Sequence, residues 1–465
     1  MNTAHSLLTA LTQALGADAV LSGNAIPDRY AHDWSPSEPV TPLAVLRPGS
    51  TAEVARALQL CSEAGVAVIP QGGLTGMVGA AVPSPGAVAL SLERMNAIES
   101  VDVASATMTV QAGATLQQVQ EAAAKHHFCF GVDLGARGSC QIGGMLATNA
   151  GGNGVVQFGM MREQALGLEV VLADSTVLPM LRPMLKNNTG YDLKQLFIGA
   201  EGTLGIVTRA VLRLHPLPRA RVTAMVALPD YDGGLRLLRE LQAAFPGGVA
   251  AFEVMWEEFF ALSLSWLKRQ TPFDSGQTHP PLAALIDVVG GQQAALEEAM
   301  QMALANAMEC GAVTDAVLAQ SSSQARNLWQ IRETTGEFPV HLQPINFDVS
   351  LPILRIGHFV QTCREALSAR WRTHRTVFFG HIGDGNLHLT VDARSLGPDV
   401  DEVEVESLIY RLLQAEDGSI SAEHGIGLLK KQFLHLSRTS TELALMRALK
   451  NVLDPRGTLN PGKIF

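Results

Sequence analysis

The sequence predicts an α+β protein of at least two domains, and three observations support this prediction. The chain has 465 residues, too many for a single hydrophobic core. Short apolar runs typical of strands alternate with longer runs in which apolar residues recur at helical spacing. The stretch His215-Pro216-Leu217-Pro218 interrupts this alternation with two prolines. We therefore expect a domain boundary near residue 218.

In the first part of the chain, helices and strands of mixed order surround glycine-rich segments. Residues Met1 to Val20 are predicted to form a helix rather than a signal peptide, because they lack a basic region followed by a long apolar run. Ser50 is expected to cap a helix that begins at Thr51. The predicted strands are 44–47, 66–69, 87–90, 108–111, 169–173 and 206–214.

After the break, strands and helices alternate, which predicts a sheet covered by helices on one face. The predicted strands are 222–228, 250–255, 282–289, 344–351, 377–381 and 387–391, and the predicted helices are 233–244, 257–267, 292–309 and 354–370. The turn Gly383-Asp384-Gly385 joins the last two strands, with Asp384 as a turn residue. Residues 459–463 are expected to form an ordered tail.

Composition limits the classes of partner. The formal net charge is -10, from 34 basic and 44 acidic residues, which argues against nucleic acid as a partner. The five cysteines form no C-x-x-C pair, which favours a reducing compartment such as the cytoplasm. No apolar run is long enough to cross a bilayer, so we expect no integral membrane segment.

The first glycine loop, residues 70–79, follows a predicted strand directly. Glycines let backbone N–H groups approach an anion closely, which suits a pyrophosphate. The loop lacks the G-x-G-x-x-G pattern of nicotinamide-binding units. An ordinary tight connection between strands explains such a loop equally well when it stands alone.

Two further glycine-dense segments favour a cofactor. Gly138–Gly144 leads into Ala147–Gly152, and Gly199–Ile206 forms the third segment. Glycine in ordered backbone costs about 0.5–1 kcal/mol relative to alanine in regular structure. Close approach of the backbone to a large, flat cofactor would account for so many glycines.

With Asp133–Cys140 and Asn188–Phe197, these segments resemble the FAD domain of the vanillyl-alcohol-oxidase/PCMH flavoprotein superfamily. More narrowly, the chain resembles the D-2-hydroxyglutarate and D-lactate dehydrogenase branch, which includes the glycolate oxidase D-subunit, over nearly its whole length. The resemblance implies an FAD-binding PCMH-type domain of two subdomains at 1–218. It also implies a ferredoxin-like α+β cap domain with a metal site at 219–424, and a C-terminal helical segment at 425–465 that packs back on the FAD domain.

The resemblance implies non-covalent FAD, since the first glycine loop contains no histidine suited to covalent attachment. Leu74 departs from the family, which usually has Asn there, but backbone N–H groups would still bind the cofactor. The implied FAD contacts are Pro70, Gln71, Gly72, Gly73, Leu74, Thr75, Gly76, Met77, Ser139, Gly143, Thr148, Asn149, Gly151, Gly205, Ile206 and Asn460.

A divalent metal site is implied at His381, His388 and Glu423. Two histidines and a carboxylate are a common ligand set for zinc or manganese, with positions left open for substrate. Spacing alone would favour two surface histidines and an unrelated Glu–His pair. The assignment therefore depends on the resemblance, which gives the matching family positions as metal ligands.

The same resemblance assigns three residues to the substrate. Asn386 would contact it, His424 would be the general base, and Arg332 would bind its carboxylate through the guanidinium fork. Asn346 and Gly336 replace a lysine and a threonine of the 2-hydroxyglutarate members, so D-lactate is as strong a candidate substrate as D-2-hydroxyglutarate.

The predicted activity is oxidation of a D-2-hydroxy acid to the 2-oxo acid, with hydride passing to flavin N5. An external electron acceptor such as a quinone or an electron-transfer flavoprotein is expected, and a homodimer is compatible with the sequence. The expected location is the cytoplasm, either free or at the surface of the inner membrane. Three alternatives remain open: an oxygen-using flavin oxidase, a non-catalytic flavin subunit of a glycolate oxidase-like complex, and a metal-dependent hydrolase.

Overall fold

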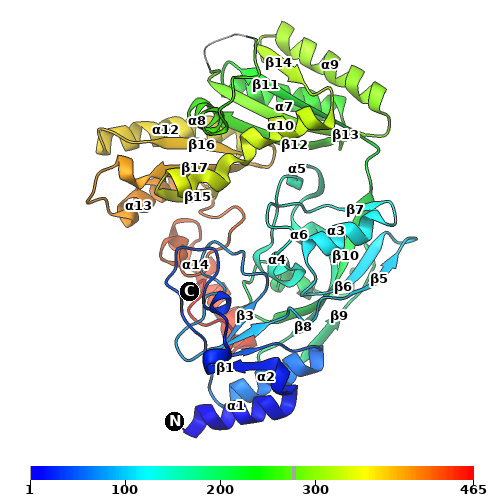
Figure 1. Cartoon of the computed structure of the whole chain (residues 1–465), viewed down its shortest axis with the longest axis vertical. Helices are drawn as coiled ribbons and strands as arrows, with labels where there is room; N and C mark the ends of the chain where they lie inside the picture. Colours follow the sequence, from blue (N-terminus) through cyan, green and yellow to red (C-terminus); the bar gives the residue numbers. More distant parts are fainter. Residues whose placement is uncertain (1, 275–278) are drawn as a thin grey trace. The chain divides into compact units, whose positions relative to one another are not determined.

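The computed structural model describes residues 2–274 and 279–465, and the chain divides into two compact units (Figure 1). The first unit contains Met1–Gly152, Phe158–Leu217 and Glu423–Phe465, and the second contains Asn153–Gln157 and Pro218–Ala422. The division after Leu217 falls within the proline-rich break. The first unit is therefore built from both ends of the chain.

The first unit contains two sheets. The smaller has the strand order β1-β2-β4-β3, with β2 (Ala44–Leu46), β4 (Val88–Ser91) and β3 (Val68–Gln71) mutually parallel and β1 (Val20–Ser22) antiparallel at the edge. The larger has the order β5-β6-β10-β8-β9, with β7 also paired to β10, and its strands are antiparallel. Its strands are β5 (Ile98–Asp102), β6 (Thr107–Gln111), β7 (Phe128–Phe130), β8 (Ala165–Val171), β9 (Val177–Met180) and β10 (Ile206–Pro216).

One hydrophobic core joins these two sheets. It includes Leu46 and Val88 from the smaller sheet and Val170 and Leu212 from the larger. The helices of the unit are α1 (Asn2–Leu15), α2 (Thr51–Glu63), α3 (Leu116–Ala124), α4 (Ile142–Thr148), α6 (Met161–Gln164) and α14 (Ser440–Leu453). As predicted, Ser50 caps α2: its side chain accepts a hydrogen bond from the backbone N–H of Glu53.

The C-terminal tail, residues 458–465, is hydrogen-bonded to this unit. Val68 of β3 donates its backbone N–H to the Thr458 carbonyl, and Asn460 donates its own to the Val68 carbonyl. The buried Lys463 ammonium donates to the carbonyls of Gly79 and Val82, which flank the end of the first glycine loop. The ordered tail expected from the sequence is thus held by backbone bonds and by one buried cation.

The second unit is built on an antiparallel sheet of order β14-β11-β13-β12-β16-β17-β15. These strands are β11 (Ala220–Leu228), β12 (Val249–Trp256), β13 (Leu282–Gly290), β14 (Asp315–Leu318), β15 (Pro344–Ser350), β16 (Thr376–His381) and β17 (Asn386–Asp392). The helices are α5 (Val155–Phe158), α7 (Tyr231–Ala244), α8 (Glu257–Leu267), α9 (Gln293–Glu309), α10 (Ser322–Arg332), α11 (Phe338–His341), α12 (Ile356–Arg370) and α13 (Glu402–Ala415).

Helices cover both faces of this sheet, so the prediction of one covered face is wrong. Met255 and Phe379 pack with Phe259 of α8 and Ile331 of α10 on one face. On the other face, Trp256 stacks on Tyr231 of α7, and Phe378 lies under the Arg364 guanidinium of α12. Every residue of β12 is buried as a result. A strand that is apolar at all but one position indicates burial on both faces, which helix–strand alternation alone did not reveal.

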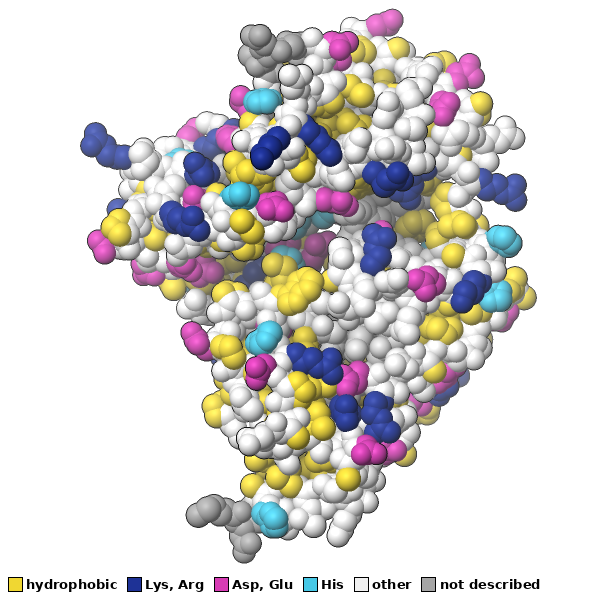
Figure 2. Space-filling model, in the orientation of Figure 1, with side chains coloured by type: hydrophobic (Ala, Val, Ile, Leu, Met, Phe, Trp, Pro, Cys, Tyr) yellow, Lys and Arg dark blue, Asp and Glu magenta, His cyan; other side chains and the backbone are white. Residues whose placement is uncertain are grey.

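Charges of the two signs are not segregated on the face of the molecule drawn in Figure 2. Figure 2 shows basic side chains lying among acidic ones on the face drawn. Within the residues that the structure describes, no helix combines the length and apolarity needed to cross a membrane.

Candidate active site

The first glycine loop presents a row of backbone donors. Within the described residues, the backbone N–H groups from Gly72 to Met77 donate no hydrogen bond. Successive N–H groups of this kind form a concave site for an anion. The row therefore fits the pyrophosphate of a dinucleotide such as FAD.

Gly73 brings this loop against the second glycine segment. A Cβ atom at Gly73 would lie 1.9 Å from the Ser139 carbonyl oxygen and 2.9 Å from the Cys140 Cα. Both atoms belong to backbone and cannot rotate away. Glycine is thus required at position 73 by the approach of two loops, independently of any cofactor.

Leu74 adopts a backbone conformation that suits asparagine. Its φ is +59°, in the left-handed region that Asn enters more readily than leucine does. Its side chain packs against a small cluster of Tyr30, Val45 and Ala89. Leucine in place of the expected asparagine therefore has a less favourable backbone conformation, but it gains apolar contacts with the cluster.

The second glycine segment contains the short helix α4. A Cβ at Gly143 would lie 2.9 Å from the Ala112 Cβ, so this glycine is also needed for close packing. Thr148 donates its hydroxyl back to the Gly144 carbonyl at 3.1 Å. Asn149 ends α4 in the left-handed conformation, and its Oδ1 accepts the backbone N–H of Arg162. The side chains of Thr148 and Asn149 thus have structural partners in addition to their predicted flavin contacts.

The third glycine segment is tightly packed. A Cβ at Gly205 would lie 2.6 Å from the Val170 side chain, and Ile206 begins β10 with 2% of its surface exposed. Only their backbones could reach a cofactor.

Three buried acceptors in the first unit have no donor among the described residues: Gln71 Oε1, Gln141 Oε1 and Asn460 Oδ1. The Gln71 amide donates to the carbonyls of Tyr30 and Ala81, which fixes its orientation. The Asn460 amide is fixed in the same way by the carbonyls of Ala80 and Glu201. A buried acceptor left unpaired costs about 1–3 kcal/mol, so such acceptors need a donor. The hydroxyl and amine groups of FAD would supply donors of this kind.

In the second unit, His381 ends β16 and His388 lies on β17. The two strands form a hairpin in which Phe379 is opposite His388. The imidazole centroids of His381 and His388 are 5.3 Å apart, with the rings nearly perpendicular. Asp384 accepts the backbone N–H of Asn386 and so serves as the expected turn residue. The hairpin brings together the two histidines that the sequence separates by the turn.

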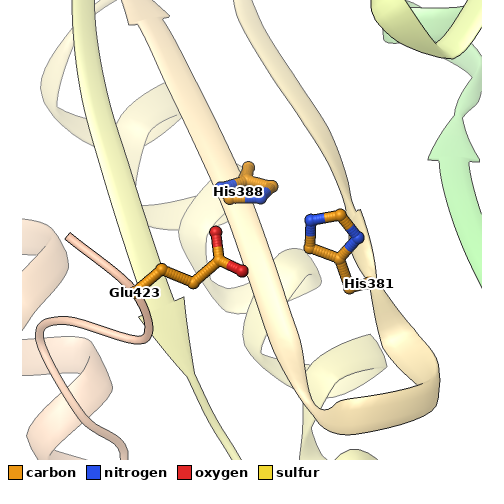
Figure 3. Close-up of side chains that lie close together, drawn as sticks. All are labelled: His381, His388 and Glu423. Carbon is orange, nitrogen blue, oxygen red and sulfur yellow. The ribbon is translucent and has the colours of Figure 1, made fainter. Parts of the chain in front are cut away.

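The side chains of the three predicted metal ligands lie close together. Glu423 follows Ala422 directly, so a single peptide bond joins it to the second unit. The candidate ligand atoms of His381, His388 and Glu423 all lie within 4.8 Å of one another (Figure 3). Glu423 also accepts the backbone N–H of Gly152. Two imidazoles and one carboxylate are a suitable donor set for zinc or manganese.

Glu253 connects His381 to Arg332. One carboxylate oxygen lies 2.5 Å from His381 Nδ1, and the other accepts from Arg332 Nε at 2.7 Å. Burial by itself raises the pKa of the Glu253 carboxyl, but the neighbouring His381 and Arg332 outweigh burial and lower that pKa to about 2. The carboxylate is therefore ionised at neutral pH.

Asn386 presents an unpaired acceptor. Its amide NH₂ donates to Asp348 Oδ1 and to the Val349 carbonyl, both at 3.0 Å, which fixes the orientation of the amide. Its Oδ1 is buried and has no donor among the described residues. Asp348 Oδ1 also lies 3.9 Å from His388 Nδ1. A substrate hydroxyl would supply the missing donor, so the predicted substrate contact of Asn386 fits.

The remaining predicted residues lie around this cluster or at the other end of the predicted substrate. His424 is half-buried in the bend after Glu423, and its candidate ligand atom lies within 4.8 Å of those of Asp348 and Glu423. Asn346 is exposed, and its Oδ1 accepts a hydrogen bond from Thr390. A Cβ at Gly336 would meet no atom within 4 Å.

Glu253 and Asp348 were missed by sequence reasoning. Each is a single carboxylate, 1% exposed, in a strand whose other residues are mainly apolar. A buried charge needs a partner. A lone Glu within Val249–Trp256 was therefore a usable signal, although the sequence could not identify its partners.

Comparisons with known proteins identify the family of both parts of the chain. Residues 42–180 match a family described as "FAD binding domain", and residues 217–464 match one described as "FAD linked oxidases, C-terminal domain". The chain is similar to "D-2-hydroxyglutarate dehydrogenase" of Xanthomonas citri pv. viticola, at 40% identity over 98% of this chain and 96% of that protein. It is 34% identical to "Putative D-lactate dehydrogenase C713.03, mitochondrial" of Schizosaccharomyces pombe, over 94% of this chain and 84% of that protein.

Solved structures share the fold at lower identity. One titled "alkyldihydroxyacetonephosphate synthase in P1" aligns with a TM-score of 0.76 at 17% identity, over 98% of this chain and 86% of that one. A p-cresol methylhydroxylase structure aligns with a TM-score of 0.74 at 16% identity, over 100% and 97% of the two chains.

Proposed function

Because this chain belongs to the FAD-linked oxidases and is an FAD-dependent D-2-hydroxy acid dehydrogenase, we propose that it oxidises D-2-hydroxyglutarate to the 2-oxo acid. The names of its relatives support this substrate. Because the chain belongs to the FAD-linked oxidases, the metal-dependent hydrolase considered in the sequence analysis is excluded.

One observation carries the proposal: in the second unit, a series of neighbouring polar side chains runs from the end of α10 across the strands of the sheet. It runs from Arg332 through Glu253 to His381, on to His388, and through Asp348 to Asn386. The series therefore connects a cation, two imidazoles and an unpaired acceptor. A 2-hydroxy acid offers the matching groups: a carboxylate and a neighbouring hydroxyl, which can together bind a metal through one oxygen each, while the hydroxyl also donates a hydrogen bond.

The residues would divide the chemistry as follows. Arg332 would bind the carboxylate through its terminal guanidinium nitrogens, because Nε is already bonded to Glu253. Asn386 Oδ1 would accept the substrate hydroxyl, and His424 would remove the hydroxyl proton. His381, His388 and Glu423 would hold a divalent metal, zinc or manganese, which when bound supplies a Lewis acid. Non-covalent FAD, when bound, supplies the hydride acceptor.

A second candidate substrate is a D-2-hydroxy monocarboxylate such as D-lactate. Asn346 offers a neutral amide already bonded to Thr390, and Gly336 offers open space. Neither supplies a charge for a distal carboxylate. The name of the fission-yeast relative also supports this candidate.

An anaerobic screen of flavin reduction tests the proposal. The FAD-loaded enzyme would be mixed with D- and L-2-hydroxyglutarate, D- and L-lactate and D-glycerate, and the loss of flavin absorbance would be followed. We expect fast bleaching by D-enantiomers alone, with D-2-hydroxyglutarate preferred. A preference for D-lactate would select the second candidate, and no bleaching by any D-2-hydroxy acid would refute both. Bleaching without added protein would also argue against a non-catalytic subunit.

Reoxidation needs an acceptor from outside the chain. We propose a quinone or an electron-transfer flavoprotein in the cytoplasm or at the inner membrane surface. Oxygen consumption during turnover would indicate an oxidase instead.

A further inference from the structure

Glu253 is an isolated charge within an apolar sheet. It lies on β12, opposite His381 of β16 and Leu285 of β13. Only 1% of its surface is exposed. A buried carboxylate is tolerated only when both oxygens have partners. At this position each oxygen has one strong partner, His381 for Oε1 and Arg332 for Oε2.

The contact with His381 occupies one of the two imidazole nitrogens. Nδ1 is engaged by Glu253 Oε1, whose partner oxygen already accepts from Arg332, so Nε2 is the ring nitrogen that would bind a metal. Carboxylates that hold the second nitrogen of a ligating histidine orient the ring and increase its basicity.

The contact with Arg332 determines how the guanidinium is presented. Nε is bonded to Glu253 at 2.7 Å, and the guanidinium carbon lies 4.7 Å from the centre of the Phe379 ring. The side chain is therefore held from one edge and one face. Its terminal nitrogens form the remaining edge, which matches a carboxylate.

We propose that Glu253 is a positioning residue that couples metal binding to carboxylate recognition. By holding His381 and Arg332 with its two oxygens, it sets the spacing between the metal ligand and the carboxylate clamp. The inference rests on the proposed function, since it assumes that His381 binds a metal and Arg332 a carboxylate. It adds a residue that touches neither.

The test uses Glu253→Gln, which keeps the size of the side chain and removes its charge. Its amide NH₂ can no longer accept from one of the two partners. The matched control is Asp287→Asn, because Asp287 is an equally buried carboxylate in the same sheet. Asp287 pairs with Arg221, Thr223 and Trp329 rather than with the site. Both variants would be prepared with FAD bound.

Two binding measurements serve as readouts besides activity. Mn²⁺ affinity would be measured from the electron paramagnetic resonance signal of the free ion. Affinity for oxamate, a carboxylate that cannot be oxidised at C2, would be measured from the flavin difference spectrum. We expect Glu253→Gln to weaken Mn²⁺ binding roughly 10–100-fold and to weaken oxamate binding as well. Asp287→Asn should change neither affinity.

Unchanged Mn²⁺ and oxamate affinities in folded, FAD-loaded Glu253→Gln would overturn the inference. Equal losses in Asp287→Asn would do the same, because they would show a general effect of disturbing the sheet. If Glu253→Gln does not fold, Glu253→Asp takes its place. The shorter carboxylate keeps its charge but cannot span both partners, so the same two losses are expected, and their absence overturns the inference.

Failure of the proposed function gives a different pattern. Wild-type protein that binds no Mn²⁺, or that binds it equally well after His381→Ala, would refute the metal centre before any Glu253 variant is made, and the inference would fall with it. Wild-type binding that His381→Ala abolishes, combined with an unaffected Glu253→Gln, would refute only the role of Glu253.

Discussion

Replacing Gly73 by alanine should separate the two glycine segments and release FAD. The new Cβ would lie 1.9 Å from the Ser139 carbonyl oxygen, about 1.4 Å short of the roughly 3.3 Å at which carbon and oxygen make ordinary contact. The Ser139 carbonyl carbon would be 2.7 Å away. Because these atoms are backbone, one loop must move as a whole. Overpacking of this kind costs about 1–3 kcal/mol or more.

The displaced loop carries the N–H groups of Gly72 to Met77, so cofactor binding should suffer together with stability. We expect FAD affinity to fall at least tenfold and Tm to fall by roughly 2–4 °C per kcal/mol lost. Flavin content per chain, FAD titration of apoprotein and thermal unfolding measure these effects. Gly135→Ala is the control, because a Cβ there meets no atom within 4 Å and the residue has no left-handed φ. Stoichiometric FAD and an unchanged Tm in Gly73→Ala would refute the steric argument.

Four further predictions concern the site and the tail. Exhaustive chelation should abolish turnover, and zinc or manganese should restore it; full activity after verified metal removal would exclude a metal role. His424→Ala should bind FAD normally and lose most of kcat, so near wild-type kcat would exclude His424 as the base. Asn386→Ala should lower kcat/KM by about tenfold or more while FAD binding stays unchanged, because the acceptor for the substrate hydroxyl is lost; an unchanged kcat/KM would remove Asn386 from the substrate site. Lys463→Met should change how stability depends on pH. Burial lowers the pKa of Lys463 to about 8, whereas the amine in the unfolded chain titrates near its ordinary 10.5. The unfolded state thus binds more protons between these values, and wild-type stability should rise with pH there relative to the variant, as urea unfolding would measure. Parallel profiles for the two proteins would contradict the shift.

Local patterns predicted many elements of the fold. Ser50 at the start of α2 and the amphipathic run of α8 appear as expected, because their signals lie within a few residues. The strands β5, β9 and β14 were not predicted. Their residues are partly exposed and weakly patterned, so pairing with neighbouring strands decides their structure. Helix α4 was not predicted either, because Gly143 and Gly144 disfavour helix and tertiary packing overrides that preference.

Of the candidate site, the sequence could predict only the residues that lie in recognisable local motifs. His381 and His388 lie on either side of a recognisable turn, so the sequence placed them on adjacent strands. Glu253 lies more than a hundred residues before His381, and strand pairing alone brings the two together. No local pattern encodes such a partner. The family resemblance supplied the candidate metal ligands and substrate residues but not Glu253, whose carboxylate contacts His381 and Arg332.

The first unit cannot fold completely until the C-terminal part of the chain has been synthesised. Its cofactor loops emerge from the ribosome early, but Asn460 and Lys463, which fasten those loops, follow the whole stretch from Pro218 to Ala422. At ordinary elongation rates that stretch takes roughly 10–40 s to translate. Until then the glycine loops lack their contacts with the C-terminal tail. A nascent chain, or one that ends before Asn460, should therefore bind FAD weakly. FAD binding would thus depend on translation having passed Lys463.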